Sequence, residues 1–144
     1  MADHYNPLVA HLKARDTSLV TVSRAGITTL KAFRERKGWS FKWVSSLEND
    51  FNWDFEVSFT QETLDSGTAR YNYRDNGFAM TEAPGISTFA KADGDVFHTY
   101  SSYGRGLENF LGIYNFLDIV PKGRDEQDLP HSMAWVRHKE QYDA

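Results

Sequence analysis

Several side chains that could carry out chemistry lie close together between His98 and Arg105. His98 and Tyr100 are two positions apart in an extended pattern, so we expect both side chains on one face of a strand. The ordinary pKa of histidine is about 6.5, which allows His98 to act as a general acid or base near neutral pH, with Tyr100 or Arg105 stabilising developing charge. The simpler interpretation of His98 is a core histidine with one nitrogen hydrogen-bonded.

The run from Ser101 to Gly106 combines hydroxyl groups and glycines with one cation. It stands where a strand passes into a helix, and the free N–H groups at the start of a helix favour an anion. Arg24 and Arg105 could add a bidentate clamp for a carboxylate or a phosphate. A plain glycine-rich connection is the commoner explanation of such a run. The residues therefore leave open whether this run holds a small anionic ligand.

The first part of the chain has the pattern of a strand, a helix and a second strand. β-Branched residues mark a strand over 17–23, apolar residues recur at helical spacing over 27–38, and 41–46 is another strand candidate. This order normally makes a right-handed crossover between parallel strands. A short helix before it is expected to begin at Asn6-Pro7, with Asn6 as its cap.

The second part of the chain is expected to hold a hairpin and a helix. Strands over 86–91 and 95–100 flank Asp93-Gly94, a pair typical of a two-residue hairpin turn, and a helix follows over 105–118. Before the hairpin, residues 50–59 alternate strictly between apolar and polar side chains, which predicts a half-buried strand with one solvated face. The polar side chains expected on that face are Asn52, Asp54, Glu56 and Ser58.

These elements predict an α/β fold, a mixed sheet flanked by helices, in which the carboxyl ends of three strands meet at one edge. Ligands of open α/β sheets usually bind at the carboxyl ends of the strands. We therefore predict a ligand site at this edge. The predicted ligand-binding residues are Arg24, Glu82, Pro84, Ser102 and Arg105, and the catalytic candidates are His98 and Tyr100.

Composition indicates one soluble domain over residues 1–144. Hydrophobic residues make up 40% and aromatic residues 15% of the chain, enough for a core built largely from rings. The formal net charge is -4 and no run approaches 18 consecutive apolar residues, which argues against nucleic-acid and membrane partners. The N-terminus lacks the basic and apolar regions of a secretory signal, so the cytoplasm is the expected location.

The chain contains no cysteine. A protein without a thiol cannot exchange disulfides, use a cysteine nucleophile or hold a metal through thiolates. The histidines show none of the spacings of zinc-binding helices. The calcium-loop pattern that begins at Asp50 fails at Phe55, where glycine is needed, and at Gln61, where glutamate is needed. We therefore predict no metal site and no cofactor.

Several ordered motifs carry a resemblance to a known family. They are VTVSRAG, GWSFKWVSS, DFNWDF, APGISTF, VFHTYSSYGRGLENFLGIYNFLD, GRDE and MAWVRHK. With them the chain closely resembles a bacterial family of thioredoxin-like proteins of unknown function, often labelled predicted dithiol-disulfide oxidoreductases. The resemblance covers nearly the whole chain and implies a thioredoxin-like, peroxiredoxin-like sheet. It also implies that Pro84 takes the family's cis-proline position, so the Ala83-Pro84 bond is predicted to be cis.

The chain departs from this family at its start. Longer relatives place a strand and a cysteine pair before the segment that begins here, so the redox label does not carry over. In a thioredoxin-like sheet the absent strand lies between the strands at 17–23 and 86–91, and unpaired buried backbone groups cost about 1–3 kcal/mol each. Either these two strands pair directly, antiparallel, or another segment or a second chain supplies the strand. A homodimer and an upstream-encoded partner both fit the second case.

Three functions remain open at this point. The leading hypothesis is a non-redox thioredoxin-like domain that binds a small anionic ligand or a protein. The second is an enzyme without a thiol that uses His98 as its acid or base. The third is one half of a split thioredoxin-like oxidoreductase, whose other half holds the strand and the cysteines.

Overall fold

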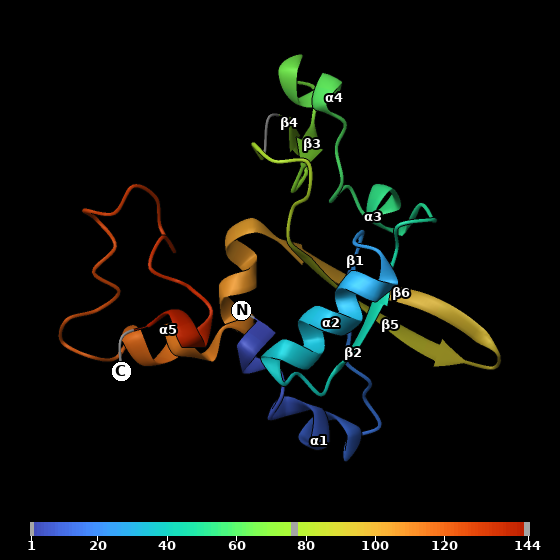
Figure 1. Cartoon of the computed structure of the whole chain (residues 1–144), viewed down its shortest axis with the longest axis horizontal. Coiled ribbons are helices and arrows are strands. Elements are labelled where there is room, and N and C mark those ends of the chain that lie inside the picture. Colours follow the sequence, from blue (N-terminus) through green and yellow to red (C-terminus); the bar gives the residue numbers. More distant parts are fainter. Residues whose placement is uncertain (1, 76–77, 143–144) are drawn as a thin grey trace. The chain divides into compact units, whose positions relative to one another are not determined.

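The computed structural model describes residues 2–75 and 78–142, and these form two compact units. One, the terminal unit, consists of Met1–Ser45 and Asn109–Ala144, and the other, the central unit, is Ser46–Glu108. Both contain helices and small sheets, so the chain is mixed α/β (Figure 1). The single domain over residues 1–144 and the thioredoxin-like architecture stay predictions.

The terminal unit contains the predicted parallel pair of strands. Its strands are β1 (Val20–Ser23) and β2 (Lys42–Ser45), and its helical elements are α1 (Leu8–Lys13), α2 (Ile27–Lys37), α5 (Gly112–Leu117) and the short 3-10 helices η1 (Ala2–His4) and η3 (Lys139–Gln141). β1 runs parallel to β2, with Val20 opposite Lys42 and Ser23 opposite Ser45, and α2 contacts β2. Gly38 ends α2 at a φ of 64°, as predicted, because a left-handed residue there costs glycine little. The strand-helix-strand prediction is confirmed.

Aromatic rings pack against one another beside α2. The Trp39 ring lies 5.5 Å from the rings of both Phe33 and Trp43 and 5.2 Å from that of Phe41, centroid to centroid. Trp39 and Phe41 are buried. The expectation of a core built largely from rings holds here.

The Asn6 side chain does not cap α1 as predicted. Helix α1 begins at Leu8 and has no side-chain cap. The Asn6 side chain instead donates to the Gly38 carbonyl oxygen at 2.8 Å and accepts from the Ser40 N–H at 2.7 Å. The prediction of an Asn6 cap was wrong because this amide satisfies the backbone beyond α2, a segment more than 30 positions away in the sequence.

The central unit is built from short elements and one long hairpin. Its helices are α3 (Phe51–Asp54) and α4 (Gln61–Asp65), and its strands are β3 (Arg70–Tyr71), β4 (Arg74–Asp75), β5 (Gly85–Ala92) and β6 (Asp95–Tyr103). Its core consists of Val57, Phe59, Ala69 and Tyr71, with Tyr103 and Phe55 among the rings packed against them.

Residues 50–59 do not form the predicted strand. Residues Phe51–Asp54 are the helix α3, and only Ser58 makes a strand-like bridge, to Glu82. A strict alternation also places aromatic residues four positions apart, and the Phe51 and Phe55 rings lie 4.7 Å apart across this helical turn. Asn52 and Ser58, expected on a solvated face, are buried. The prediction was wrong because period-two spacing does not exclude a helical turn.

The hairpin of β5 and β6 is confirmed, including its turn. Asp93 and Gly94 have φ values of 52° and 93°, the left-handed pair of a type I′ turn. The pairing shifts between Thr88 and Phe89, because Thr88 lies opposite Tyr100 while Phe89 lies opposite His98. Thr99 is therefore an extra residue, a β-bulge.

The helix predicted over 105–118 is two helices. The 3-10 helix η2 covers Gly104–Phe110, and α5 begins at Gly112 after Leu111, whose φ of -114° and ψ of 88° are not helical. Glycines at 104, 106 and 112 weaken the helical preference of this stretch, so its apolar stripe alone does not stabilise one continuous helix.

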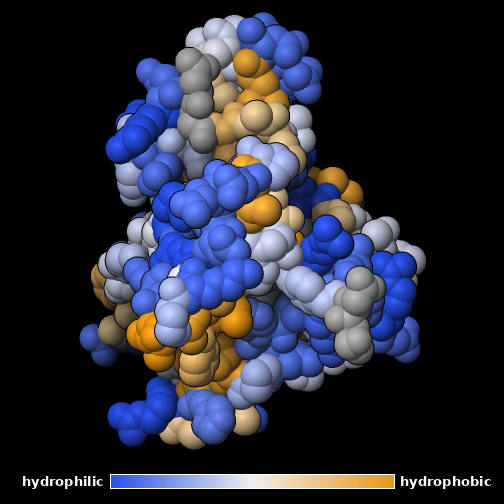
Figure 2. All heavy atoms as spheres, turned by 90° about the vertical axis from the view of Figure 1, so that its left-hand side faces the viewer, coloured by the Kyte–Doolittle hydropathy of each residue, from blue (hydrophilic) through white to orange (hydrophobic). Residues whose placement is uncertain are grey.

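Within residues 2–75 and 78–142 the sheets are three separate pairs of strands, β1 with β2, β3 with β4, and β5 with β6. The pairing of β1, in the terminal unit, with β5, in the central unit, was one of the two expected repairs of the sheet and stays a prediction. In the described part of the chain, no helix combines the length and the apolar composition needed to cross a membrane. On the face drawn in Figure 2, hydrophilic residues cover most of the surface and hydrophobic residues form small groups.

Candidate functional site

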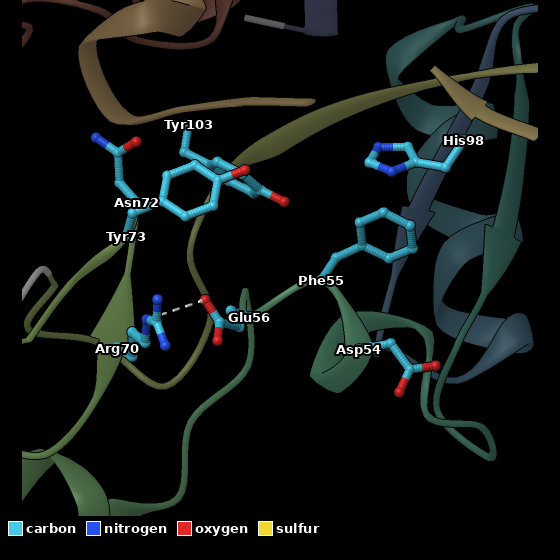
Figure 3. Close-up of a pocket in the computed structure, with 8 residues that line it drawn as sticks. All are labelled: Asp54, Phe55, Glu56, Arg70, Asn72, Tyr73, His98 and Tyr103. Atoms are coloured by element: carbon cyan, nitrogen blue, oxygen red, sulfur yellow. Dashed lines mark ion pairs between the residues drawn. The ribbon is translucent and has the colours of Figure 1, made fainter. Parts of the chain in front are cut away.

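A pocket of about 380 Å³ lies within the central unit. Its walls come from the end of α3, from the β3–β4 hairpin and from β6 (Figure 3). The residues that line it are Asp54, Phe55, Glu56, Arg70, Asn72, Tyr73, His98 and Tyr103. The pocket therefore combines aromatic rings, two carboxylates, a guanidinium, an amide and an imidazole.

Rings form much of the pocket wall. The Phe55 ring meets the His98 ring edge to face at 5.3 Å, and the Tyr73 ring meets that of Tyr103 in the same way at 6.0 Å. The Phe89 ring, on the opposite strand, lies 5.4 Å from the His98 ring and 5.7 Å from the Phe55 ring, so the three rings pack as a cluster. Edge-to-face packing of this kind fixes ring orientation, so the wall is stiff.

The charged groups of the pocket are loosely paired. Arg70 Nε lies 3.8 Å from Glu56 Oε2, the contact drawn as a dashed line in Figure 3, and about half of each side chain is exposed. An exposed ion pair of this length contributes little to stability. A ligand can therefore replace either partner at small cost to the fold. Asp54 points away from the Phe55 ring in Figure 3.

Three of the pocket residues hold a left-handed backbone without being glycine. The φ values are 50° at Glu56, 53° at Asn72 and 62° at Tyr73. Asn72 and Tyr73 form the two-residue turn between β3 and β4, where asparagine followed by glycine is the favoured pair. Tyrosine in place of glycine is strained there, and its side chain is 70% exposed.

Glu56 occupies the position after α3 where helices usually carry glycine. The Val57 N–H donates to the Asn52 carbonyl and the Glu56 N–H to the Trp53 carbonyl, which is the Schellman pattern. Gly38 takes the equivalent place after α2, with the same pair of bonds. The chain thus uses glycine in the turn after α2 and glutamate in the turn that borders the pocket.

His98 lines the pocket, but it does not share a face with Tyr100. Opposed residues of a ladder share a face, so His98 follows Phe89 while Tyr100 follows Thr88. Because Thr88 and Phe89 are neighbours and point to opposite faces, the bulge at Thr99 separates the two candidates. The prediction of a shared face was wrong for this reason.

The His98 ring is tied to its own strand. Its Nε2 lies 3.0 Å from the Tyr100 carbonyl oxygen and 2.7 Å from Ser101 Oγ. Ser101 Oγ in turn lies 2.7 Å from Ser87 Oγ on β5. These contacts orient the imidazole and join it to a short chain of hydroxyl groups.

None of the five predicted ligand-binding residues lines this pocket. Glu82 accepts hydrogen bonds from Asn52 at 3.2 Å and Ser58 at 2.7 Å. Arg105 forms an ion pair with Glu108 within η2. Arg24 belongs to the terminal unit, so a clamp with Arg105 stays a prediction.

The Tyr71 hydroxyl is hydrogen-bonded both to the glycine-rich run and to Pro84. Tyr71 Oη accepts from the Gly104 N–H and donates to the Pro84 carbonyl, both at 2.7 Å. A Cβ added at Gly106 would come too close to the Ser102 hydroxyl, so the Ser102 side chain would have to turn away. Gly104 and Gly106 thus both lie in close contact with other residues of the chain. Their role and that of Ser102 toward a ligand stay predictions.

The predicted cis bond at Pro84 was wrong, because no peptide bond in the described residues is cis. The Ala83 N–H donates to the Val57 carbonyl at 2.8 Å, and β5 begins at Gly85. The chain therefore passes from this hydrogen bond through Pro84 directly into β5 without a turn. A trans bond suits such a path, whereas cis bonds are typical of tight turns.

Sequence reasoning found His98 and missed the other pocket residues apart from Tyr103, which was noted only as part of the glycine-rich run. One sequence pattern could have indicated two of them, Asn72 and Tyr73. Arg70-Tyr71-Asn72-Tyr73-Arg74 carries an asparagine between aromatic residues, and asparagine tolerates the left-handed turn positions of a hairpin.

The family model described as "Bacterial protein of unknown function (DUF899)" matches residues 1–142. The chain belongs to this bacterial family. No curated protein and no solved structure matches it. Membership of the family assigns no activity, so the geometry of the central unit is the basis for a function.

Proposed function

We propose that the central unit binds a small ligand, a flat molecule with polar groups at its edge, in the pocket lined by Tyr73, Tyr103 and His98. The chain would then be a ligand-binding, non-redox member of its family, with a thioredoxin-like ancestry implied by its motifs. Its 144 residues contain no thiol, so dithiol chemistry has no group to act through.

The observation that carries this proposal is the use of Glu56 and Tyr73 at backbone positions that favour glycine. A non-glycine residue at a left-handed position costs about 1–2 kcal/mol. Strain of this kind gathers at binding sites, where the side chain is needed and its surroundings hold it. Both side chains line the same pocket.

The chemistry of the wall indicates the class of ligand. Ring faces and edges favour a flat, partly apolar body, which stacks or packs edge-on. Arg70 and Asn72 can donate hydrogen bonds to oxygen atoms of the ligand, and Glu56 can accept one. The volume of about 380 Å³ lies at the small end of pockets that hold such molecules. The anionic group expected from the sequence would pair with Arg70, in place of Glu56.

Probe binding tests the proposal directly. Benzoate, benzylamine and nicotinamide, added to millimolar concentration, are expected to shift the ring resonances of Tyr73, Tyr103 and His98 in NMR spectra, benzoate the most. The informative variant is Tyr73→Gly, because glycine fits the turn better. It is expected to keep or raise stability while weakening binding.

The matched control is Asp93→Gly in the β5–β6 turn. It also removes a left-handed non-glycine residue from a type I′ turn of the central unit, and Asp93 does not line the pocket. It should leave binding unchanged. If none of the probes moves the three ring resonances, or if Tyr73→Gly binds as well as the parent chain, the pocket is not the site.

A second candidate function uses the contact between His98 Nε2 and Ser101 Oγ. A histidine can serve as a general base toward a neighbouring hydroxyl when its nitrogen is unprotonated, and in that tautomer His98 Nε2 no longer donates to the Tyr100 carbonyl oxygen. This candidate requires slow hydrolysis of an activated ester such as p-nitrophenyl acetate, lost in His98→Gln and in Ser101→Ala. Unchanged hydrolysis in both variants would eliminate it, and Tyr100→Phe is the control because that side chain lies on the other face.

A further inference from the structure

We propose that Nδ1 of His98 accepts a hydrogen bond from the ligand of the central unit. The pocket would then select flat molecules with a carboxylate at one end and a hydroxyl or amino group at the other. Hydroxybenzoates and aminobenzoates are the simplest members of this class. The inference rests on the proposed function, because it assigns a second polar contact to the same ligand.

The first observation concerns the position of the proton on the His98 ring. Nε2 lies 3.0 Å from the Tyr100 carbonyl oxygen. A carbonyl oxygen can only accept a hydrogen bond, so this contact requires a proton on Nε2. A neutral imidazole carries a single proton, and its other nitrogen is then a hydrogen-bond acceptor. The backbone of β6 thus selects the tautomer in which Nδ1 is the acceptor.

The second observation is that the neighbouring hydroxyl groups fit the same tautomer. Ser101 Oγ lies 2.7 Å from His98 Nε2 and 2.7 Å from Ser87 Oγ. Ser101 can accept from Nε2 and donate its own proton to Ser87, so each group has a partner. With the proton on Nδ1 instead, Nε2 and the Tyr100 carbonyl would turn lone pairs toward each other. The hydrogen bonds of β6 and β5 therefore agree on one proton position.

The third observation is that Nδ1 is left for a group in the pocket. Among the residues that the structure describes, none forms a hydrogen bond or an ion pair with Nδ1 of His98. The side chains packed on the ring are Phe55 and Phe89, whose rings provide no hydrogen-bonding group. His98 and Phe55 both line the pocket, and Figure 3 shows their rings facing each other. A ligand donor at this wall would meet Nδ1 as its acceptor.

The two polar ends of the pocket define the class of ligand. Figure 3 shows Arg70 and Glu56 apart from His98, with aromatic rings on the remaining wall. The proposed function places an anionic group on Arg70. The far edge of a flat ligand held there then faces His98. A donor on that edge gains a hydrogen bond, whereas an edge without a donor leaves Nδ1 unsatisfied.

Matched pairs of probes test this contact. We compare meta- and para-hydroxybenzoate with meta- and para-fluorobenzoate at about pH 8, where an ordinary imidazole is neutral. Fluorine is close to a hydroxyl in size but cannot donate a proton. For the isomer that fits better, we expect the hydroxybenzoate to bind about fivefold more tightly than its fluoro analogue.

Variants show whether His98 causes this preference. His98→Phe keeps a ring in the wall and removes the acceptor, so the hydroxybenzoate should lose its advantage over the fluorobenzoate. Tyr100→Phe is the matched control, because it leaves the Tyr100 carbonyl in place and its side chain lies on the other face of the hairpin. It should keep the full preference. Circular dichroism shows whether both variants fold.

NMR measures the tautomer in the parent chain without any ligand or variant. A long-range proton–nitrogen correlation spectrum of the isotope-labelled chain distinguishes the protonated ring nitrogen from the unprotonated one. We expect the His98 proton on Nε2. The Nδ1 resonance should then shift when the hydroxybenzoate is added, and should shift much less with the fluorobenzoate.

The possible results separate this inference from the proposed function. If no benzoate binds, the proposed function fails and this inference fails with it. If the benzoates bind but the hydroxyl group gives no advantage, or His98→Phe keeps that advantage, the pocket stands and the role of Nδ1 is refuted. A proton on Nδ1 in the ligand-free chain would also refute it, and would favour the second candidate function, which needs an unprotonated Nε2.

Discussion

The hydroxyl group of Tyr71 is the point where three segments of the central unit are joined, and replacing it tests how that unit is held together. Tyr71 is 3% exposed and lies in β3. Its hydroxyl donates to the Pro84 carbonyl just before β5 and accepts from the Gly104 N–H just after β6. Tyr71→Phe keeps the ring and its contacts and removes only these two bonds.

The expected cost follows from the two backbone groups left behind. A buried donor or acceptor without a partner costs about 1–3 kcal/mol, so the two groups could cost up to about 6 kcal/mol. The site is only partly buried, and water can replace some of what is lost. We therefore expect Tyr71→Phe to lower the free energy of unfolding of the central unit by about 2–4 kcal/mol.

Urea denaturation followed by fluorine NMR of fluorotryptophan measures this change unit by unit. Trp53 is the one tryptophan of the central unit, while the other three lie in the terminal unit. The matched control is Tyr103→Phe, whose ring packs at 5.9 Å from that of Tyr71 but whose hydroxyl joins neither bond. A loss below about 0.5 kcal/mol at the Trp53 resonance, or an equal loss in Tyr103→Phe, would refute the reasoning.

Further predictions concern the terminal unit and the effect of pH. Gly38→Ala should destabilise the terminal unit by about 1 kcal/mol because φ is 64° there, whereas Gly112→Ala, where φ is not positive and no atom lies near, should not. Burial acts to raise the pKa of Asp3, but hydrogen bonds from N–H groups, led by that of Lys139, outweigh it and lower that pKa. The stability that Asp3 contributes is therefore present above pH 3.8 and is lost as the pH falls through the folded pKa of Asp3. Asp3→Asn should make the free energy of unfolding, measured by urea titration, depend less on pH in this acid range. Two side chains and one N–H donate to a single oxygen of Glu126, so Glu126→Gln should cost about 1–3 kcal/mol by urea denaturation, against no loss in the exposed Asp128→Asn.

Several elements could be predicted because their evidence is local. Asp93-Gly94 supplies the left-handed turn that the β5–β6 hairpin requires, and Gly38 ends α2 for a similar reason. β1 and β2 were predictable from β-branched and aromatic runs on either side of a helical stretch. In each case the residues that give the signal are neighbours in the sequence.

Other features depend on partners that are distant in the sequence. Alternation over 50–59 is compatible with a strand, but the Phe51–Phe55 contact and the burial of Asn52 against Glu82 favour a helical turn. Nothing in the strand pattern around His98 indicates the bulge at Thr99. This bulge decides the face of the hairpin on which the His98 and Tyr100 side chains lie. The pocket was missed because its walls come from three stretches that no common motif links.

By itself, the sequence determined which chemistry is absent and which local shapes form. It has no thiol, it places left-handed turns at Gly38 and Asp93-Gly94, and its motifs lead to its bacterial family. Only the tertiary structure decided that Glu56, Tyr73 and His98 line one pocket while Tyr100 points to the other face. The physical reason is that turn preferences act between neighbouring residues, whereas a pocket wall or a bulge is set by packing between segments that are far apart in the chain.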